Sequence, residues 1–256
     1  MASPLFDLTG KVAIVTGSSK GIGKSIALHL ALQGARVVVS SRKQPACEEA
    51  AEEIRKAGGE AIVIPCNISD KAQCERLVAE TRRQLGPIDV LVCNAASNPY
   101  YGPTEKMPDD VFTKIMQNNI LSNIWLTTLC VPDMRARKDG SVIIVSSIGG
   151  VRASTVIGAY CISKAADMQL ARNLAAELGP DNIRVNTIAP GLVRTDFARA
   201  LWEDPKYLDK RLQTAPLRRI GEPDDIGGIA VMLASKAGAF ITGQTIIADA
   251  GVTIGG

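Results

Sequence analysis

The sequence predicts an α/β fold: a doubly wound, seven-stranded parallel sheet with helices on both faces. Three observations support this prediction. Short runs rich in Val and Ile alternate with longer segments of helical periodicity. Most of the short runs are apolar on both faces, as parallel strands covered by helices are. No linker or break in composition divides the chain, so residues 1–256 are expected to form a single domain.

Strands and helices are expected in regular alternation. The predicted strands are residues 12–16, 36–40, 60–66, 89–94, 141–146, 184–188 and 245–249. The predicted long helices are residues 21–33, 44–57, 71–85, 109–137, 156–178 and 223–235. Glycine follows four of these helices, at Gly34, Gly58, Gly86 and Gly179. This is typical of helix ends, because glycine readily adopts the left-handed conformation that stops a helix.

One segment departs from the regular alternation. Residues 191–219, between the sixth strand and the last helix, are charged and include Phe197 and Trp202. A segment of this length inside a compact domain is usually functional. We expect it to form a lid over the substrate.

Composition and charge exclude several classes of function. The formal net charge is +3 and no run of Lys or Arg reaches five residues, so neither nucleic acid nor a membrane surface is an expected partner. The N-terminus lacks a signal-peptide profile and no apolar stretch approaches the ~18 residues of a membrane span, which favours a cytoplasmic location. His29 is the only histidine, which excludes Ser-His-Asp and Cys-His catalysis and a multi-histidine metal site. We expect no metal.

A glycine-rich turn follows the first predicted strand and opens a helix. It reads Thr16-Gly17-Ser18-Ser19-Lys20-Gly21-Ile22-Gly23. Glycines allow a ligand to approach the backbone closely, and free N–H groups at a helix start attract phosphate. The P-loop pattern fails because residue 18 is serine, and the common G-x-G-x-x-G pattern fails because residue 19 is serine. The pattern that fits is T-G-x-x-x-G-x-G.

A tyrosine and a lysine are candidates for acid/base chemistry. Tyr160 and Lys164 are four residues apart in a predicted helix, so they share one face. An ammonium group nearby favours phenolate and lowers the phenol pKa, which lets tyrosine exchange a proton near neutral pH. Ser147 follows the strand at 141–146, at the carboxyl edge of the sheet, where ligands of open α/β folds bind. The alternative interpretation is a surface tyrosine with a neighbouring lysine and a capping serine.

In combination, these motifs resemble those of the classical short-chain dehydrogenases/reductases over nearly the whole chain. They occur in the family's order: the glycine turn at 16–23, Cys93-Asn94-Ala95-Ala96, Asn119, Ser147, Tyr160 with Lys164, and Pro190-Gly191. The segments 94–99 and 189–192 are most similar to the carbonyl-reductase branch. The resemblance implies a Rossmann fold and an oxidoreductase that uses a nicotinamide cofactor.

The resemblance also implies a role for each motif residue. Tyr160 would be the general acid in reduction and the base in oxidation. Lys164 would lower the Tyr160 pKa and hold the nicotinamide ribose, and Ser147 would donate a hydrogen bond to the substrate oxygen. Asn119 would hold a water in a proton relay to Lys164, although the neighbouring Asn118 leaves this assignment open by one position.

Cofactor contacts are expected along several loops by the same resemblance. They are Gly17, Ser19, Lys20, Gly21, Ile22, Gly23, Ser41, Arg42, Lys43, Asn67, Ile68, Asn94, Ala95, Ala96, Tyr160, Lys164, Pro190, Gly191, Val193 and Thr195. Two positions depart from the family pattern. Cys93-Asn94-Ala95-Ala96 replaces the usual Asn-Asn-Ala-Gly, and Asn67 replaces the usual Asp.

The end of the second strand predicts NADP(H) rather than NAD(H). NAD enzymes have an acidic residue there that binds the ribose 2′-hydroxyl, and a carboxylate would repel a 2′-phosphate. Here the chain has Ser41, followed by Arg42 and Lys43, and Lys20 in the glycine turn adds a third cation. Arg suits phosphate because its planar fork donates two parallel hydrogen bonds. In the alternative interpretation these cations only solvate the end of a strand.

Apolar residues near the motifs suggest a small-molecule carbonyl or alcohol substrate with hydrophobic substituents. The expected pocket residues are Asn98, Pro99, Tyr100, Tyr101, Ile148, Val151, Ala153, Leu192, Phe197 and Trp202. Related enzymes pair the long helices at 109–137 and 156–178, which implies a homotetramer. Two alternatives stay open: a non-catalytic nucleotide-sensing regulator on the same fold, and a family enzyme of another reaction class, such as an enoyl reductase.

Overall fold

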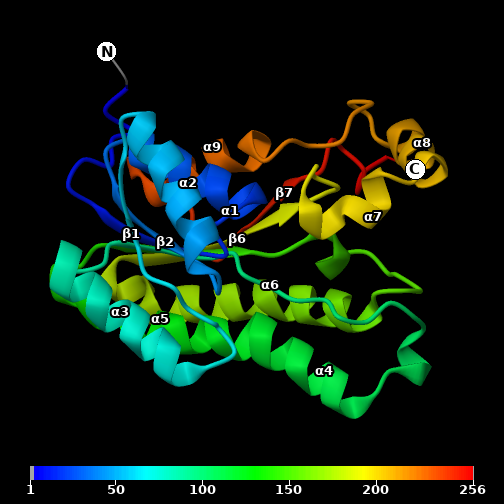
Figure 1. Ribbon diagram of the computed structural model, residues 1–256, viewed down its shortest axis with the longest axis horizontal. Coiled ribbons are helices and arrows are strands. Elements are labelled where there is room, and N and C mark those ends of the chain that lie inside the picture. Colours follow the sequence, from blue (N-terminus) through cyan, green and yellow to red (C-terminus); the bar gives the residue numbers. More distant parts are fainter. Residues whose placement is uncertain (1–2, 256) are drawn as a thin grey trace.

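The computed structural model describes residues 3–255, and its centre is a seven-stranded sheet in which every neighbouring pair is parallel (Figure 1). The spatial order is β3-β2-β1-β4-β5-β6-β7. The strands are β1 (Val12–Thr16), β2 (Arg36–Ser40), β3 (Glu60–Val63), β4 (Val90–Cys93), β5 (Gly140–Val145), β6 (Ile183–Pro190) and β7 (Thr245–Ala248). The order reverses between β1 and β4, and ligands of doubly wound sheets bind beyond the carboxyl ends of the strands at such a point.

Helices cover both faces of this sheet (Figure 1). One face carries α1 (Gly21–Leu32), α2 (Gln44–Lys56) and α9 (Asp224–Ala234). The other carries α3 (Lys71–Leu85), α5 (Ser122–Arg137) and α6 (Gly158–Leu178), with α4 (Asp109–Met116) packed against α6. The predicted fold class is confirmed.

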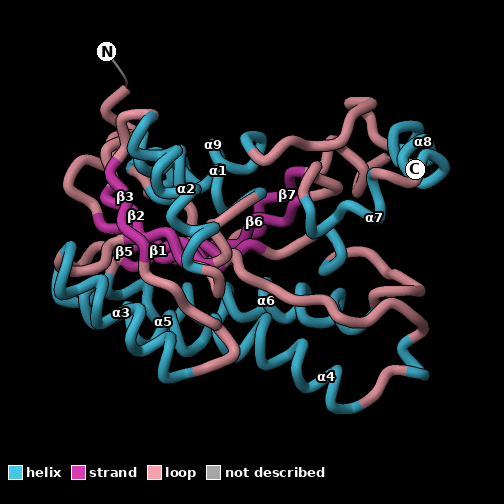
Figure 2. The backbone as a smooth tube through the Cα atoms, viewed as in Figure 1, coloured by secondary structure: helices cyan, strands magenta, loops and turns pink. Residues whose placement is uncertain are grey.

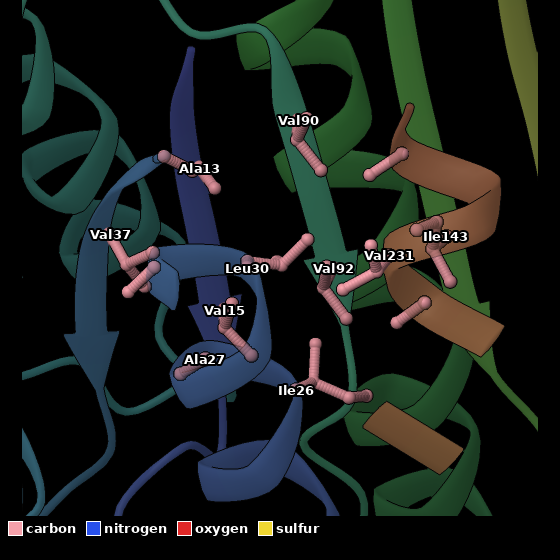
Figure 3. Packing of buried hydrophobic residues seen from close by; sticks show 14 of the residues in the cluster. Ala13, Val15, Ile26, Ala27, Leu30, Val37, Val90, Val92, Ile143 and Val231 are labelled. Carbon is pink, nitrogen blue, oxygen red and sulfur yellow. The ribbon is translucent and has the colours of Figure 1, made fainter. Parts of the chain in front are cut away.

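Two hydrophobic cores follow from the alternation of side chains along buried strands. In β1, Ala13 and Val15 face α1 and α9, where they pack with Leu30 and Val231 (Figure 3). Val12 and Ile14 belong to the core beneath α3, α5 and α6. Because successive strand residues point to opposite faces, both halves of the pattern must be apolar when both faces are covered. Burial on two faces therefore fixes the register of the central strands.

Two predicted elements are interrupted in the structure. The helix expected at 109–137 is divided into α4 and α5 by a π-helical turn, Gln117–Leu121. Side chains of the next turn bond to the carbonyls there: Ser122 Oγ donates to the Asn118 oxygen, and Asn123 Nδ2 donates to the Asn119 oxygen. The strand expected at 60–66 ends at Val63, and Pro65, which lacks an N–H, prevents a regular continuation.

Residues 191–219 contain regular structure that was not predicted. They include α7 (Arg199–Trp202) and α8 (Pro205–Thr214), which lie beyond the carboxyl end of the sheet (Figure 2). Asp204 caps α8 by accepting from the N–H groups of Lys206 and Tyr207. Gly34, Gly58 and Gly86 have the expected left-handed φ, but Gly179 does not: the chain continues there into a 3₁₀ turn that ends at the left-handed Asn182. Within residues 3–255, no helix has the length and apolar character needed to cross a membrane.

Candidate active site

The glycine turn is fastened to the strands beside it. Asn94, at the end of β4, donates from Nδ2 to the carbonyl oxygens of Thr16 and Gly17, at 2.9 and 3.1 Å. Ser18 Oγ donates to the Val15 oxygen and accepts from the Ser40 N–H, which ties the turn to β2. At Gly23 an added Cβ would lie 2.4 Å from the Gly17 oxygen, so no side chain fits there. The turn is therefore packed closely against the first turn of α1.

A cavity of about 710 Å³ lies along the carboxyl ends of the strands, from the glycine turn to α6. With the exception of Asn119, every predicted catalytic and cofactor residue lines it: Gly17, Ser19, Lys20, Gly21, Ile22, Gly23, Ser41, Arg42, Lys43, Asn67, Ile68, Asn94, Ala95, Ala96, Ser147, Tyr160, Lys164, Pro190, Gly191, Val193 and Thr195. We call Ser147, Tyr160 and Lys164 the catalytic end, and Lys20, Ser41, Arg42 and Lys43 the phosphate end.

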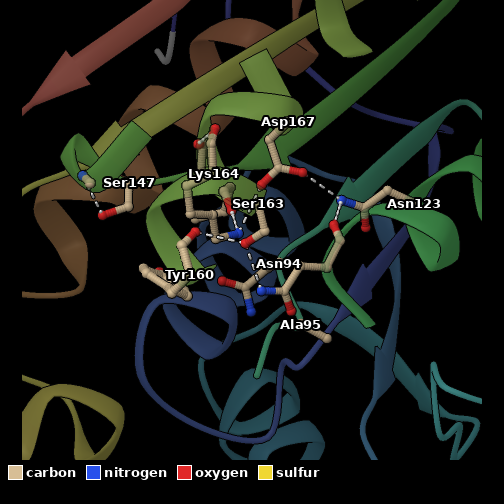
Figure 4. A network of polar contacts seen from close by, with 12 residues as sticks. Asn94, Ala95, Asn123, Ser147, Tyr160, Ser163, Lys164 and Asp167 are labelled. Carbon is tan, nitrogen blue, oxygen red and sulfur yellow. Dashed lines mark hydrogen bonds and ion pairs between the residues drawn. The ribbon is translucent and has the colours of Figure 1, made fainter. Parts of the chain in front are cut away.

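Lys164 at the catalytic end is held by buried bonds (Figure 4). Its Nζ donates to the Val145 oxygen at the end of β5 and to Asp167 Oδ2, both at 2.9 Å. The ammonium also lies 5.6 Å from the centroid of the Tyr160 ring. The backbone oxygen of Lys164 accepts from Ser146 Oγ at 2.7 Å, which attaches α6 to the strand that ends beside it. The lysine is therefore fixed at both its main chain and its ammonium group.

Burial changes the acidity of this group. The pKa of Tyr160 is raised from its ordinary value of 10.0, chiefly because the phenol is desolvated; Lys164 and Ser147 act in the opposite direction, and Asp167 raises the pKa further. Lys164 lowers the pKa of Tyr160, as the sequence predicts, but burial raises that pKa by more. Desolvation opposes the charged form of Lys164, yet Asp167 and Tyr160 leave the lysine pKa above its usual 10.5.

Ser147 has a defined orientation. Its Oγ accepts from the N–H of Gly149 at 3.0 Å, in the turn that follows β5. Since a hydroxyl has one proton, this contact leaves the proton of Ser147 to be donated elsewhere. The residue lines the cavity beside Tyr160, as the resemblance implied.

Asn119 lies behind the cavity. It is fully buried; its Oδ1 accepts from the Ser97 N–H at 2.8 Å, and its Nδ2 donates to the Ser97 oxygen and to Ser163 Oγ. Asn118 lines the cavity instead. The side chain of Asn119 therefore positions the loop after β4 and the start of α6, and its role in a water relay stays a prediction.

The phosphate end is more open. Arg42 and Lys43 are exposed, and neither forms an ion pair with any carboxylate of residues 3–255. Lys20 differs from the expectation, because its Nζ is paired with Asp196 at 2.8 Å. Ser41 Oγ lies 3.1 Å from Cys47 Sγ.

Most of the expected substrate-pocket residues lie elsewhere. Of the ten, Phe197 is the one found in the cavity lining, and its ring centroid is 6.0 Å from that of Tyr160. Tyr100 donates to the Pro103 oxygen, Trp202 donates to the Thr195 oxygen, and Leu192 lines a separate small cavity. Loop residues cannot be assigned to a pocket from proximity in sequence, because their direction depends on tertiary contacts. No group of three His, Cys, Asp or Glu side chains suited to a metal ion occurs among residues 3–255.

Two polar residues of the site were missed by the sequence analysis. Asp167 is fully buried on α6 and pairs with Lys164, and Asn123 on α5 donates to Asp167 Oδ1 at 3.0 Å (Figure 4). The available signal was an aspartate three residues after Lys164, on the same helical face, among apolar neighbours.

Known proteins resemble this chain over most of its length. A family model described as enoyl-(acyl carrier protein) reductase matches residues 17–253. The dehydrogenase/reductase SDR family member 4 of Homo sapiens is 41% identical over 244 residues, which cover 95% of this chain and 88% of the relative.

Two solved structures show what similar chains bind. A 7α-hydroxysteroid dehydrogenase complexed with NADH and 7-oxoglycochenodeoxycholic acid has a TM-score of 0.94 and 35% identity, covering 98% of this chain and 97% of the other. A gluconate 5-dehydrogenase from Burkholderia cenocepacia in complex with NADP and tartrate has a TM-score of 0.93 and 30% identity, covering 98% of each chain. Both nicotinamide cofactors therefore occur among its structural neighbours.

Proposed function

This chain belongs to the short-chain dehydrogenase/reductase (SDR) family, and we propose that it is an NADP(H)-dependent carbonyl reductase or secondary alcohol dehydrogenase. The single observation that carries the proposal is the position of Tyr160 and Lys164 together at one end of a cavity whose other end presents Arg42 and Lys43. A hydride donor and a proton donor must reach the same carbonyl group, and a cavity of about 710 Å³ that is lined by both the glycine turn and Tyr160 could hold both.

The residues fit a dinucleotide. Gly23 leaves no room for a side chain, because an added Cβ would meet the Gly17 oxygen and the Asn94 amide, so only glycine lets the turn fold this tightly at the start of α1. The first turn of α1 contains no acidic residue, and its N-cap Lys20 makes no side-chain capping bond, so the N–H groups at the helix start are available to a pyrophosphate. Asn67 and Ile68 would flank the adenine, and Thr195 and Val193 would contact the pyrophosphate and the carboxamide.

The unpaired cations support NADP(H) over NAD(H). A 2′-phosphate beside Ser41 would meet Arg42 and Lys43, and no carboxylate in the described part of the chain is paired with either cation to compete with it. Lys20 would reach the phosphate only by leaving Asp196, and because both side chains are about half or more exposed, that pair is weak.

The chain's own residues supply the proton chemistry. A reduced nicotinamide, when bound, supplies the hydride. Ser147 donates its hydroxyl proton as a hydrogen bond to the carbonyl oxygen, while Tyr160 gives up the phenolic proton to that oxygen as it becomes an alcohol. Lys164 stabilises the phenolate left behind, since its ammonium is close to the ring. In oxidation the phenolate would take the proton back.

Phe197 supports a substrate with a hydrophobic substituent. This residue of the 191–219 segment is 53% exposed, yet it lines the cavity with its ring tilted against Tyr160. An apolar group beside the reacting carbonyl would cover Phe197 and remove that surface from water. We propose that residues 191–219 act as the substrate lid.

The test is a screen of NADPH consumption. Ketones, aldehydes and ketosteroids are supplied at equal concentration with NADPH or NADH, and an enoyl thioester is included because the matching family model is described as an enoyl reductase. We expect turnover of ketones or aldehydes, at least tenfold faster with NADPH at subsaturating cofactor. Tyr160→Phe should abolish it. Turnover of the enoyl thioester alone would favour an enoyl reductase, and cofactor binding without any turnover would favour a nucleotide-sensing regulator.

We propose further that the chain forms a homotetramer. Leu121, Ile124 and Ile162 are each about two-fifths exposed on the outward sides of the π-helical turn, α5 and α6. Apolar residues on two adjacent long helices favour pairing with a second copy. Light scattering should report four times the 27.1 kDa chain mass, and a monomeric mass would overturn this.

A further inference from the structure

Asp167 lies one helical turn beyond Lys164 and is fully buried. Its exposed fraction is 0%, and each carboxylate oxygen has one donor: Lys164 Nζ on Oδ2 at 2.9 Å, and Asn123 Nδ2 on Oδ1 at 3.0 Å (Figure 4). A buried carboxylate is strongly unfavourable unless it is paired and hydrogen-bonded, and both conditions hold here. Its location three residues from a cavity-lining lysine points to a role in the site.

The ammonium group of Lys164 is divided between the network and the cavity. It has three protons, of which one goes to the Val145 oxygen and one to Asp167 Oδ2. The third remains for the cavity that Lys164 lines. Asp167 thus determines which way the ammonium points, and it neutralises part of the positive charge that Tyr160 experiences.

We propose that Asp167 is a positioning residue of the proposed oxidoreductase: it holds Lys164 against the end of β5 and limits how far that ammonium acidifies Tyr160. This inference rests on the proposed function for its catalytic meaning. The placement and the charge effect rest only on the contacts above.

The charged and titratable groups around the pair are few. On α6 they are Tyr160, Cys161, Lys164 and Asp167, and from β4 the Cys93 thiol faces Lys164. Burial raises the pKa of Cys93 well above 9.0, so that thiol stays neutral. Asn123 on α5 and Ser147 after β5 carry no charge. Asp167 is therefore the negative charge that acts on the lysine and the tyrosine.

Removing this charge makes the first proton of the pair easier to lose, and the tyrosinate titration follows that step because Lys164 stabilises the phenolate, so that Tyr160 is the partner that loses it. Asp167 raises the pKa of Tyr160 and also that of Lys164. The two groups titrate as a pair. Without this carboxylate, the first apparent pKa of the pair should fall by about one to two pH units.

The experiment compares Asp167→Asn with Asn123→Ala. The first removes the charge and keeps the size, while the second removes the other half of the network and keeps the charge. The activity readout is the pH dependence of kcat/KM for NADP⁺-dependent oxidation of a secondary alcohol. The second readout is the pH dependence of tyrosinate absorbance in the cofactor-free protein. For the wild type and for each variant, the same protein with Tyr160→Phe added is subtracted, which leaves the signal of Tyr160. This readout needs no turnover.

We expect Asp167→Asn to move the acidic limb of the profile and the Tyr160 titration downward by about one unit or more. Asn123→Ala should move neither by more than about 0.3 unit, although it loses stability. If both variants lose stability and neither shifts the titration, Asp167 only packs, and the inference is wrong. If Asp167→Asn does not fold, Asp167→Ser, which leaves room for a water, takes its place with the same expected shift. A shifted tyrosinate titration in a protein that oxidises no alcohol would uphold the charge effect and reject the proposed function.

Discussion

The two ends of the cavity are built in contrasting ways. At the catalytic end Lys164, Asp167 and Asn123 are almost fully buried and bonded to one another. At the phosphate end Arg42 and Lys43 are exposed, and within residues 3–255 they have no carboxylate partner. Under the proposed function, a buried and hydrogen-bonded network would support the proton donor, while exposed cations would recognise a doubly charged phosphate. Substitutions at the two ends should therefore have separable effects on rate, affinity and stability.

The same substitution at both ends should give the largest contrast. Lys164→Met leaves Asp167 buried without its cation, which should cost about 3–5 kcal/mol of unfolding free energy and reduce kcat about 100-fold or more. Lys43→Met should change the unfolding free energy by no more than about 0.5 kcal/mol. Urea unfolding at pH 7 with steady-state kinetics measures both. Equal stability losses in the two variants would remove the contrast.

Removing the cations of the phosphate end should alter affinity alone. Each of Arg42 and Lys43 can form a charge-assisted bond to a 2′-phosphate, so the double substitution Arg42→Ala/Lys43→Ala should weaken NADPH binding about 10- to 100-fold. The affinity for NADH should stay within about twofold, since NADH has no such phosphate. Fluorescence titration with both cofactors checks this, and parallel losses for NADH and NADPH would argue against a phosphate site.

A buried thiol in the core beneath α3, α5 and α6 should make the fold sensitive to alkali. Desolvation raises the pKa of Cys130, which is fully buried on α5, from 9.0 to about 12. A raised folded-state pKa means that the contribution to stability is complete below about pH 9 and is lost as pH rises toward 12. Between pH 8 and 10.5 this thiol should account for about 2 kcal/mol of lost stability. Cys130→Ala should therefore lose less than the wild type over that interval in urea melts, whatever its starting stability; equal losses would show that the thiol does not contribute.

Salt should act on the opposite end, with the smallest effect. Exposed charges are screened when the Debye length falls, from about 10 Å at 0.1 M to about 3 Å at 1 M ionic strength. Raising the salt concentration over this range should increase KM for NADPH roughly three- to tenfold and leave kcat nearly constant. The Arg42→Ala/Lys43→Ala variant is the control and should lose most of this dependence. A salt effect on kcat rather than on KM would contradict the proposal that the exposed cations act on cofactor affinity and not on the chemical step.

The same contrast explains which features the sequence could predict. The glycine turn, Ser147 and the Tyr160/Lys164 pair are set by short spacings and by strand ends, and the structure gathers them at one cavity. Buried strands were also predictable, because two covered faces demand continuous apolar runs. The end of β3 at Val63 could also have been predicted, because Pro65 lacks the N–H group that a continuing strand would need.

Features that depend on partners distant in sequence were not predictable in this way. The Asp167 carboxylate accepts a hydrogen bond from Asn123, which is 44 residues away on another helix. The contact of Lys20 with a phosphate stays a prediction, and its ion pair with Asp196, far along the chain, was not foreseen. Local pattern could not show any of these contacts.

The central claim is that the Tyr160 phenol delivers the proton at the catalytic end. Single-turnover oxidation of bound NADPH by a ketone, followed in the wild type and in Tyr160→Phe with cofactor affinity measured in parallel, tests it most directly. We predict a rate about 10² to 10⁴ times slower in the variant, with an unchanged Kd for NADPH. A rate within about threefold of the wild type, with the cofactor bound normally, would contradict the account.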